Sequence, residues 1–226
     1  MKKLTIMGLV IALVISMLSI PAVALDKNAT EALATQKLFT EAKSDLSTAE
    51  LKILFPNAMI SEAKTIEALQ KMERGIIPDS MNPNKTPIQQ FTYKYPDSSF
   101  VTLKVYADGT RATYGLTQGT SVNYGYASVH TGAKVWGNQS MLFSASYYVN
   151  YTLSSGGSSI TSCYSYSLSP WGPYYGQVNG YPYTPTTVAG FYFTINVVQG
   201  SITIPNNYCL QLSVTTTSAY VSCFPY

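Results

Sequence analysis

Ionisable side chains are nearly absent from the second half of this chain. From Ala112 to Tyr226 there is no Asp or Glu, and the only Lys and His are Lys134 and His130. Glycosidase-type hydrolysis needs two carboxyl groups and a calcium site needs several oxygen ligands, carboxylates among them, so this half supplies neither. We expect it to recognise partners through aromatic, hydroxyl and backbone groups.

Cysteine and histidine are also scarce. The single His and the three Cys, with no CxxC pair, give no zinc-ligand pattern. We predict no metal site and no cofactor. The alternation of apolar residues places Cys163 and Cys209 on outward-facing positions and Cys223 toward the core. In an exported protein this predicts a disulfide between Cys163 and Cys209, with Cys223 a buried thiol.

Charge is close to balanced, with 14 Lys and Arg against 11 Asp and Glu. Two of the cations, Lys2 and Lys3, belong to the N-terminal segment described next, so the rest of the chain has almost no net charge. Binding to phosphates needs clustered cations. We therefore predict no nucleic-acid partner.

Residues 1–24 have the pattern of a secretory signal peptide. Two lysines precede an uncharged run from Leu4 to Ile20, and the segment ends in small residues at Ala22 and Ala24. We predict cleavage after Ala24, a secreted or extracellular protein, and no stable membrane span afterwards. The alternative is a protein tethered to a membrane by the uncleaved segment.

Residues 25–76 hold most of the acids and no Tyr, Trp or Cys. Apolar residues at helical spacing predict three short helices. The first covers about 28–44, the second begins at a capping box formed by Ser47 and Glu50, and the third runs from Met59 to Met72. This helical region is either a permanent cap or a pro-segment or partner-binding hairpin. Three prolines in residues 77–88 predict a stiff, extended linker.

Residues 89–226 alternate between apolar and polar positions, which predicts antiparallel strands. The predicted strands are 91–95, 100–106, 111–116, 141–153, 160–168, 191–198, 208–214 and 219–224. Asp97 and Asp108 are interpreted as turn residues. The fold class is mainly β with a small α N-terminal region (α+β), an antiparallel β-sandwich preceded by two or three short helices. A single-walled barrel is the alternative.

The face assignments within these strands follow from the same alternation. In strand 160–168, Ile160, Tyr164, Tyr166 and Leu168 are predicted to face the core. A turn at 215–217 with two central residues would place Leu210 opposite Cys223 and Leu212 opposite Val221.

The stretch 169–185 contains one Trp, four Tyr, four Pro and three Gly. Rigid rings with polar tips are typical of surfaces that stack on sugars or bind proteins. We interpret the stretch as a loop that presents such rings, unless it folds them back over the sandwich edge. The predicted binding residues are Trp171, Tyr174, Tyr175, Tyr181 and Tyr183, with Trp136 adding to the same surface.

These observations predict a secreted or cell-surface, non-enzymatic binding or adhesion protein whose partner is carbohydrate or a protein surface. The alternative is a structural extracellular or envelope-associated protein that acts by self-association. A hydrolase using His130 with Cys163 or Cys209 comes third, because no catalytic motif surrounds these residues. We expect His130 to lie in an exposed loop or at a strand edge.

Overall fold

The computed structural model describes residues 27–226, apart from 73, 172–173, 181–185 and 200–201. The chain forms two compact units, Met1–Lys37 and Leu38–Tyr226. The described part of the first unit belongs to helix α2, Lys27–Thr40. The predicted signal peptide, 1–24, lies outside the described residues. None of the described helices has the length and apolar character needed to cross a membrane.

Helices α3, Thr48–Leu54, and α4, Glu62–Met72, precede the strands. Helix α3 begins at the predicted capping box. The Glu50 N–H donates to Ser47 Oγ at 3.2 Å, and the Ser47 N–H donates to Glu50 Oε2 at 2.7 Å. The box satisfies two backbone donors that the first helical turn would otherwise leave unpaired, which explains why the helix begins here.

The segment 77–88, predicted as an extended linker, contains a 3-10 helix, η1, Asp79–Met81. Met81 is only 2% exposed and joins the main core. The Ser80 N–H donates to Thr110 Oγ1 at 3.2 Å, and Gln139 Nε2 donates to the Ser80 carbonyl. The prolines indicated stiffness, but this part of the segment is fastened to the strands.

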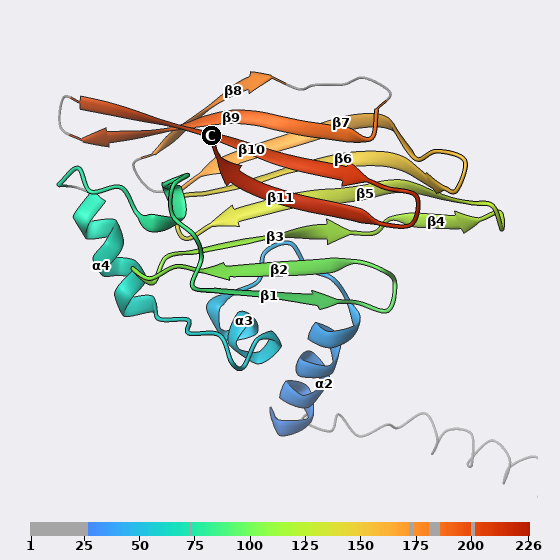
Figure 1. Cartoon of the computed structure of the whole chain (residues 1–226). Helices are drawn as coiled ribbons and strands as arrows, with labels where there is room; N and C mark the ends of the chain where they lie inside the picture. Colours follow the sequence, from blue (N-terminus) through green and yellow to red (C-terminus); the bar gives the residue numbers. More distant parts are fainter. Residues whose placement is uncertain (1–26, 73, 172–173, 181–185, 200–201) are drawn as a thin grey trace, which may run out of the picture. The chain divides into compact units, whose positions relative to one another are not determined.

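Eleven described strands form two antiparallel sheets (Figure 1). The large sheet has, in order, β1 Gln89–Lys94, β2 Phe100–Val105, β3 Arg111–Thr117, β5 Ala127–Gln139, β6 Phe143–Ser154 and β7 Ser159–Pro170, with β4 Thr120–Asn123 paired to β5. The small sheet has β11 Ala219–Pro225, β10 Ile202–Val214, β9 Val188–Gln199 and β8 Tyr175–Gly180. A mostly antiparallel β structure with three short helices toward its N-terminal side confirms the predicted α+β class, and the two packed sheets are sandwich-like.

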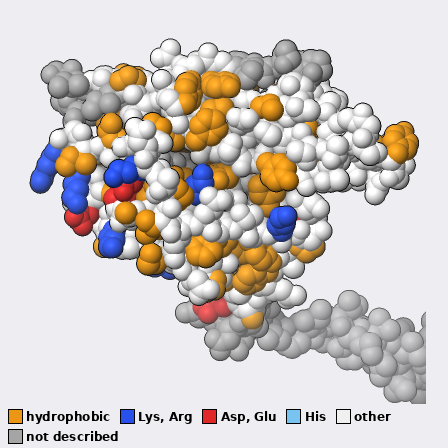
Figure 2. All heavy atoms as spheres, viewed as in Figure 1, with side chains coloured by type: hydrophobic (Ala, Val, Ile, Leu, Met, Phe, Trp, Pro, Cys, Tyr) orange, Lys and Arg blue, Asp and Glu red, His pale blue; other side chains and the backbone are white. Residues whose placement is uncertain are grey.

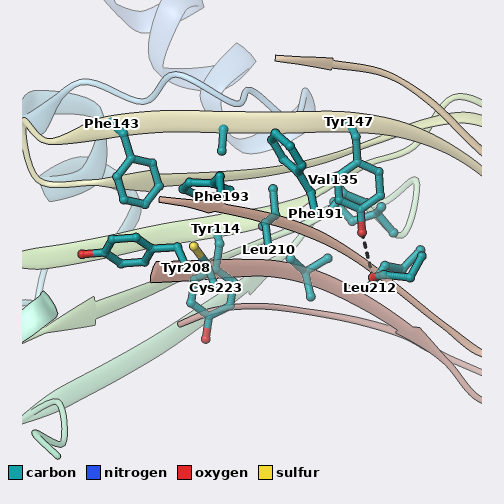
Figure 3. Close-up of a cluster of buried hydrophobic side chains, with 14 of the residues drawn as sticks. Tyr114, Val135, Phe143, Tyr147, Phe191, Phe193, Tyr208, Leu210, Leu212 and Cys223 are labelled. Carbon is teal, nitrogen blue, oxygen red and sulfur yellow. Dashed lines mark hydrogen bonds between the residues drawn. The ribbon is translucent and has the colours of Figure 1, made fainter. Parts of the chain in front are cut away.

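The main core lies between the two sheets (Figure 3). The ring of Phe143 from the large sheet contacts Phe193 and Tyr208 of the small sheet, with centroids 5.0 and 4.7 Å apart. The inward positions predicted for β9 and β10 are buried, namely Phe191, Phe193, Ile195, Val197, Leu210, Leu212 and Val214. Leu210 pairs with Cys223 and Leu212 with Val221, so the predicted register of the last hairpin is confirmed.

A second core covers the opposite face of the large sheet. Leu51 and Leu54 of α3 pack there with Val101, Leu103 and Trp136. Strands β2 and β3 are therefore buried on both faces over most of their length.

The turns use the two acids as predicted. Asp97 Oδ1 accepts the Ser99 N–H at 2.8 Å, and Asp108 Oδ1 accepts the Thr110 N–H at 2.9 Å. Each carboxylate satisfies backbone donors of its own turn, and Gly109 provides the left-handed conformation with φ of 85°.

Strand β7 departs from the predicted alternation. The register shifts between the pairs Asn150–Ser162 and Tyr151–Ile160, which marks a bulge at Thr161. One extra residue reverses the faces of the next positions, so Cys163 packs against the core while Tyr164 is 39% exposed. A second register shift, between the pairs Tyr148–Tyr164 and Ser146–Ser167, restores the alternation, so Leu168 packs against the core as predicted. The predictions that Cys163 faces outward and that Tyr164 faces the core were wrong. Tyr166, also predicted to face the core, is 47% exposed, although its ring lies 5.8 Å from that of the core residue Phe191.

Candidate functional site

The stretch predicted as one aromatic loop is divided by a strand. Residues 175–180 form β8, which pairs with β9, so this part is not a loop. Trp171 lies between β7 and β8, and Trp171 and Tyr175 are each 50% exposed. Tyr174 packs against the core, and its N–H donates to the Trp171 carbonyl at 3.4 Å. Tyr181 and Tyr183 lie outside the described residues.

Trp136 does not belong to this exposed surface. Its side chain is 2% exposed in the second core, and its Nε1–H donates to Thr117 Oγ1 at 3.2 Å. The position is outward in the large sheet, but helix α3 covers that face. Burial by α3 therefore corrects the prediction that Trp136 binds a partner.

Tyr175 begins a row of neutral side chains on the side of the small sheet that faces away from the core. We call this surface the amide face. It consists of Tyr175, Gln177 and Asn179 on β8, Tyr192, Thr194 and Asn196 on β9, and Asn207, Cys209 and Gln211 on β10. No helix that the structure describes lies over it in Figure 1.

Hydrogen bonds link the amide face across three strands. Asn179 Nδ2 donates to Thr194 Oγ1 at 2.5 Å, and that hydroxyl donates to Asn207 Oδ1 at 2.8 Å. Thr194 is 8% exposed, whereas Asn179 and Asn207 are exposed. The bonds hold the two exposed amides in place, and an amide carries two donors and two acceptor sites, so each keeps capacity for a partner.

An aromatic pair lies at one end of the amide face. The rings of Tyr192 and Tyr226 meet edge to face, with centroids 5.7 Å apart, and Tyr226 is 54% exposed. The Tyr226 N–H donates to the Asn207 carbonyl at 3.1 Å, which fixes the chain end to β10. Cys209 is fully buried next to Tyr192, and this thiol is the main cause that raises the pKa of Tyr192. The Tyr192 phenol is therefore a neutral hydrogen-bonding group near neutral pH.

Charged side chains lie elsewhere. In the view of Figure 2, most blue and red spheres are on the side of α4, and a few others lie near the middle and in the lower part of the molecule. The upper part, where Figure 1 has β8 to β10, shows only hydrophobic and other uncharged side chains.

The predicted bridge between Cys163 and Cys209 is not present, and all three cysteines are free. Cys163 lies opposite Val149 and packs against the core, whereas Cys209 is on the amide face, so the small sheet separates the two thiols. Burial raises the pKa of Cys163 and of Cys209 to about 11 and that of Cys223 to about 12. The thiols are therefore protonated and weakly nucleophilic at neutral pH.

Thiol counting tests this arrangement. We expect the unreduced protein to react with an aromatic disulfide reagent at three thiols once unfolded in denaturant. The native protein should react far more slowly, because Cys209 and Cys223 are buried, Cys163 is partly buried, and all three thiols are protonated. A reduced sample is the control. A count of one thiol in the unfolded, unreduced protein would show that a disulfide exists.

The third predicted arrangement, a Cys and His pair, is not assembled by the described contacts. His130 lies in β5 and is 7% exposed, so the expectation of an exposed loop or edge position was wrong. Its Nδ1 is 3.2 Å from Gln118 Oε1, and its ring stacks on Tyr151. Neither contact brings the imidazole to Cys163 or Cys209.

The described residues include a small pocket but no cluster of metal-ligating side chains. No group of three or more His, Cys, Asp or Glu there could hold a metal ion. A pocket lined by Met72, Met81, Val197 and Asn206 has a volume of about 10 Å³, room for a single water.

Comparisons of the chain with models of protein families, with curated proteins and with solved structures gave no match.

Proposed function

We propose that this is an exported, non-enzymatic binding protein that recognises carbohydrate through the amide face and the adjacent ring of Trp171. The observation that carries the proposal is the joint exposure of Trp171 and Tyr175 at the start of β8, beside fixed amides and away from charge. Export rests on the signal-peptide pattern in residues 1–24.

The chemistry of this surface favours a neutral sugar chain. Aromatic faces stack on the apolar faces of sugar rings, and amides such as Asn179 and Asn207 both donate to and accept from hydroxyl groups. The amide face has no cation to pair with a sulfated or uronic acid chain. A protein surface is the other partner that such tyrosine- and asparagine-rich surfaces bind.

Glycan binding by matched variants tests the proposal. We expect the protein to bind neutral glycans on an array or as insoluble polysaccharide, and the double variant W171A/Y175A to bind at least about tenfold more weakly, because two stacking rings are lost. The control is Tyr220→Ala, which removes an equally exposed tyrosine (57%) on β11. Absence of binding by the unmutated protein, or equal binding by W171A/Y175A, would contradict the proposal.

Self-association is the second candidate, because one strand edge is favourable for it. Among the described strands, β8 pairs only with β9, and residues 175–180 include no Lys or Pro, the residues that commonly block edge pairing. Sedimentation at several concentrations separates the two functions. A dimer or larger species that Gln177→Pro disrupts would favour the structural role over glycan binding.

A further inference from the structure

Strand β4 and the first part of β5 form a hairpin at one end of the large sheet, where β4 pairs only with β5 and residues 127–130 of β5 also pair with β6. All four residues of β4 are exposed, and the hairpin is visible at the right of Figure 1. Its tip carries Tyr124 and Tyr126, which are 58% and 76% exposed. The Gly125 N–H donates to Asn123 Oδ1 at 2.8 Å and Gly125 has a φ of 83°, so the turn itself is well defined.

Gln118, at the base of this hairpin, holds it to the rest of the large sheet. The Gln118 N–H donates to Ser99 Oγ at 2.8 Å, and its Nε2 donates to the Tyr151 hydroxyl at 2.8 Å. Its Oε1 lies 3.2 Å from His130 Nδ1. With this amide orientation, Nδ1 carries the proton of a neutral imidazole.

His130 is enclosed at the same place. Its ring stacks on Tyr151 with centroids 4.4 Å apart and planes 10° from parallel. Its Nε2 is buried and has no hydrogen-bond partner in the part of the chain that the structure describes. The neutral ring leaves only an acceptor unsatisfied, whereas the protonated ring would place an N–H donor and a charge in the same position, which is far more costly.

Among the described residues, no charged group in direct contact with His130 compensates that cost. The nearest carboxylate in the network is Asp97, which accepts the Ser99 hydroxyl at 2.8 Å and so reaches Gln118 only through Ser99. The cation on the same strand, Lys134, donates to Ser44 Oγ at 3.0 Å. On the paired strands His130 lies opposite Ser121 and Tyr151, both uncharged at neutral pH.

A bulge follows directly after His130. The pairing of β5 with β6 shifts register between His130 and Ala133, and Gly132 within this bulge has a φ of 70°. Residues 127–130 of β5 stay paired with β6 on the hairpin side of the bulge, whereas β4 pairs only with β5, so β4 is the part of the hairpin that can move most easily.

We propose that His130 is a pH-sensitive latch at the base of the β4–β5 hairpin. Protonation of Nε2 forces the imidazole to leave its enclosed position for water. This movement breaks the contact with Gln118 and the stacking on Tyr151, and it releases Gln118 and the adjoining strand β4, which pairs only with β5. The turn that carries Tyr124 and Tyr126 then gains mobility.

The direction of the effect follows from burial, which lowers the pKa of His130 from its ordinary value of 6.5. The folded state thus binds fewer protons than the unfolded state. The latch is fully stable above that ordinary value, and it weakens as pH falls from there through the lowered pKa of the folded protein.

Hydrogen exchange measured by mass spectrometry tests the latch. Between about pH 7.5 and pH 5, after correction for intrinsic rates, we expect the protection of residues 118–131 in the full-length protein to fall at least about tenfold, with little change in β9 and β10. In His130→Gln, which can bond Gln118 but does not titrate, we expect the same segment to show no such pH dependence. Asp97→Asn removes the nearby carboxylate, so a pH dependence of protection that persists in this variant does not come from Asp97.

Unchanged protection in the unmutated protein, or equal pH dependence in His130→Gln, would overturn the proposal. If His130→Gln fails to fold, proton NMR of the unmutated protein replaces it, since its one histidine gives one set of imidazole signals. A titration midpoint at or above 6.5 would also overturn the proposal.

Discussion

Trp136→Ala is expected to lower the free energy of unfolding by about 3–5 kcal/mol. The indole is 2% exposed and lies between β5 and the side chains of Leu51, Leu54 and Leu103. Alanine would leave a cavity in the layer that attaches α3 to the large sheet. Thr117 Oγ1 would also lose the hydrogen bond that it now accepts from the Trp136 Nε1–H. Urea unfolding followed by circular dichroism measures the loss.

The matched control is Trp171→Ala, because the chain has only these two tryptophans. Trp171 is 50% exposed, so its removal is expected to change stability by no more than about 0.5 kcal/mol. The emission of Trp171→Phe should be blue-shifted, because only the buried indole remains, and that of Trp136→Phe should be red-shifted. Equal stability losses for the two alanine variants would show that Trp136 is not a core residue.

Gly115→Ala is expected to destabilise the protein by about 3 kcal/mol. Gly115 is in β3, where a Cβ would overlap the carbonyl oxygen of Phe100 and lie 2.9 Å from the Trp136 ring. The first obstacle is backbone of a paired strand and the second is a buried indole, so neither can move without disturbing the sheet or the second core.

Gly156→Ala is the control for this substitution. Gly156 lies in the turn between β6 and β7, where the atom nearest to an added Cβ would be the Ser154 hydroxyl oxygen at 3.7 Å. We expect a change within about 0.5 kcal/mol. Thermal unfolding of both variants gives the comparison, and a Gly115→Ala protein as stable as Gly156→Ala would contradict the close approach of β2, β3 and β5.

The strongest local signals in the sequence predicted the structure well. The Ser47–Glu50 capping box begins a helix, Asp108-Gly109 makes a hairpin turn, and Phe191 to Val197 alternate as predicted. Each depends on residues a few positions apart. The register of β10 and β11 was also predicted, because a short turn fixes the pairing of the strands that it joins.

Strand β5 was not predicted, although it is central in the large sheet. Gly132, Lys134 and Gly137 interrupt its apolar pattern. Part of its outward face is buried by contacts distant in sequence, since Lys134 Nζ and Asn138 Nδ2 donate to Ser44 Oγ and the Ser44 carbonyl. Alternation of apolar and polar residues indicates a strand only where one face of the sheet is buried and the other is exposed to water.

The candidate site was also predicted only in part from the sequence. Exposure of Trp171 and Tyr175 followed from their place in a stretch rich in Pro and Gly. The amide face was not predicted, because Asn179, Thr194 and Asn207 come together only through the pairing of β8, β9 and β10. An Asn at an outward position looks like any other polar strand residue until its neighbours across the sheet are known.

By itself, the sequence determined the composition of this protein's surface: a strand-rich half without carboxylates, with aromatic, hydroxyl and amide groups as its means of contact. The tertiary structure decided which of those groups are accessible. It buried Trp136 and His130, turned Cys163 inward through one bulged residue, and gathered the exposed amides on one sheet face. The reason is physical, because side-chain chemistry is local to each residue, whereas burial depends on which distant segment packs against it.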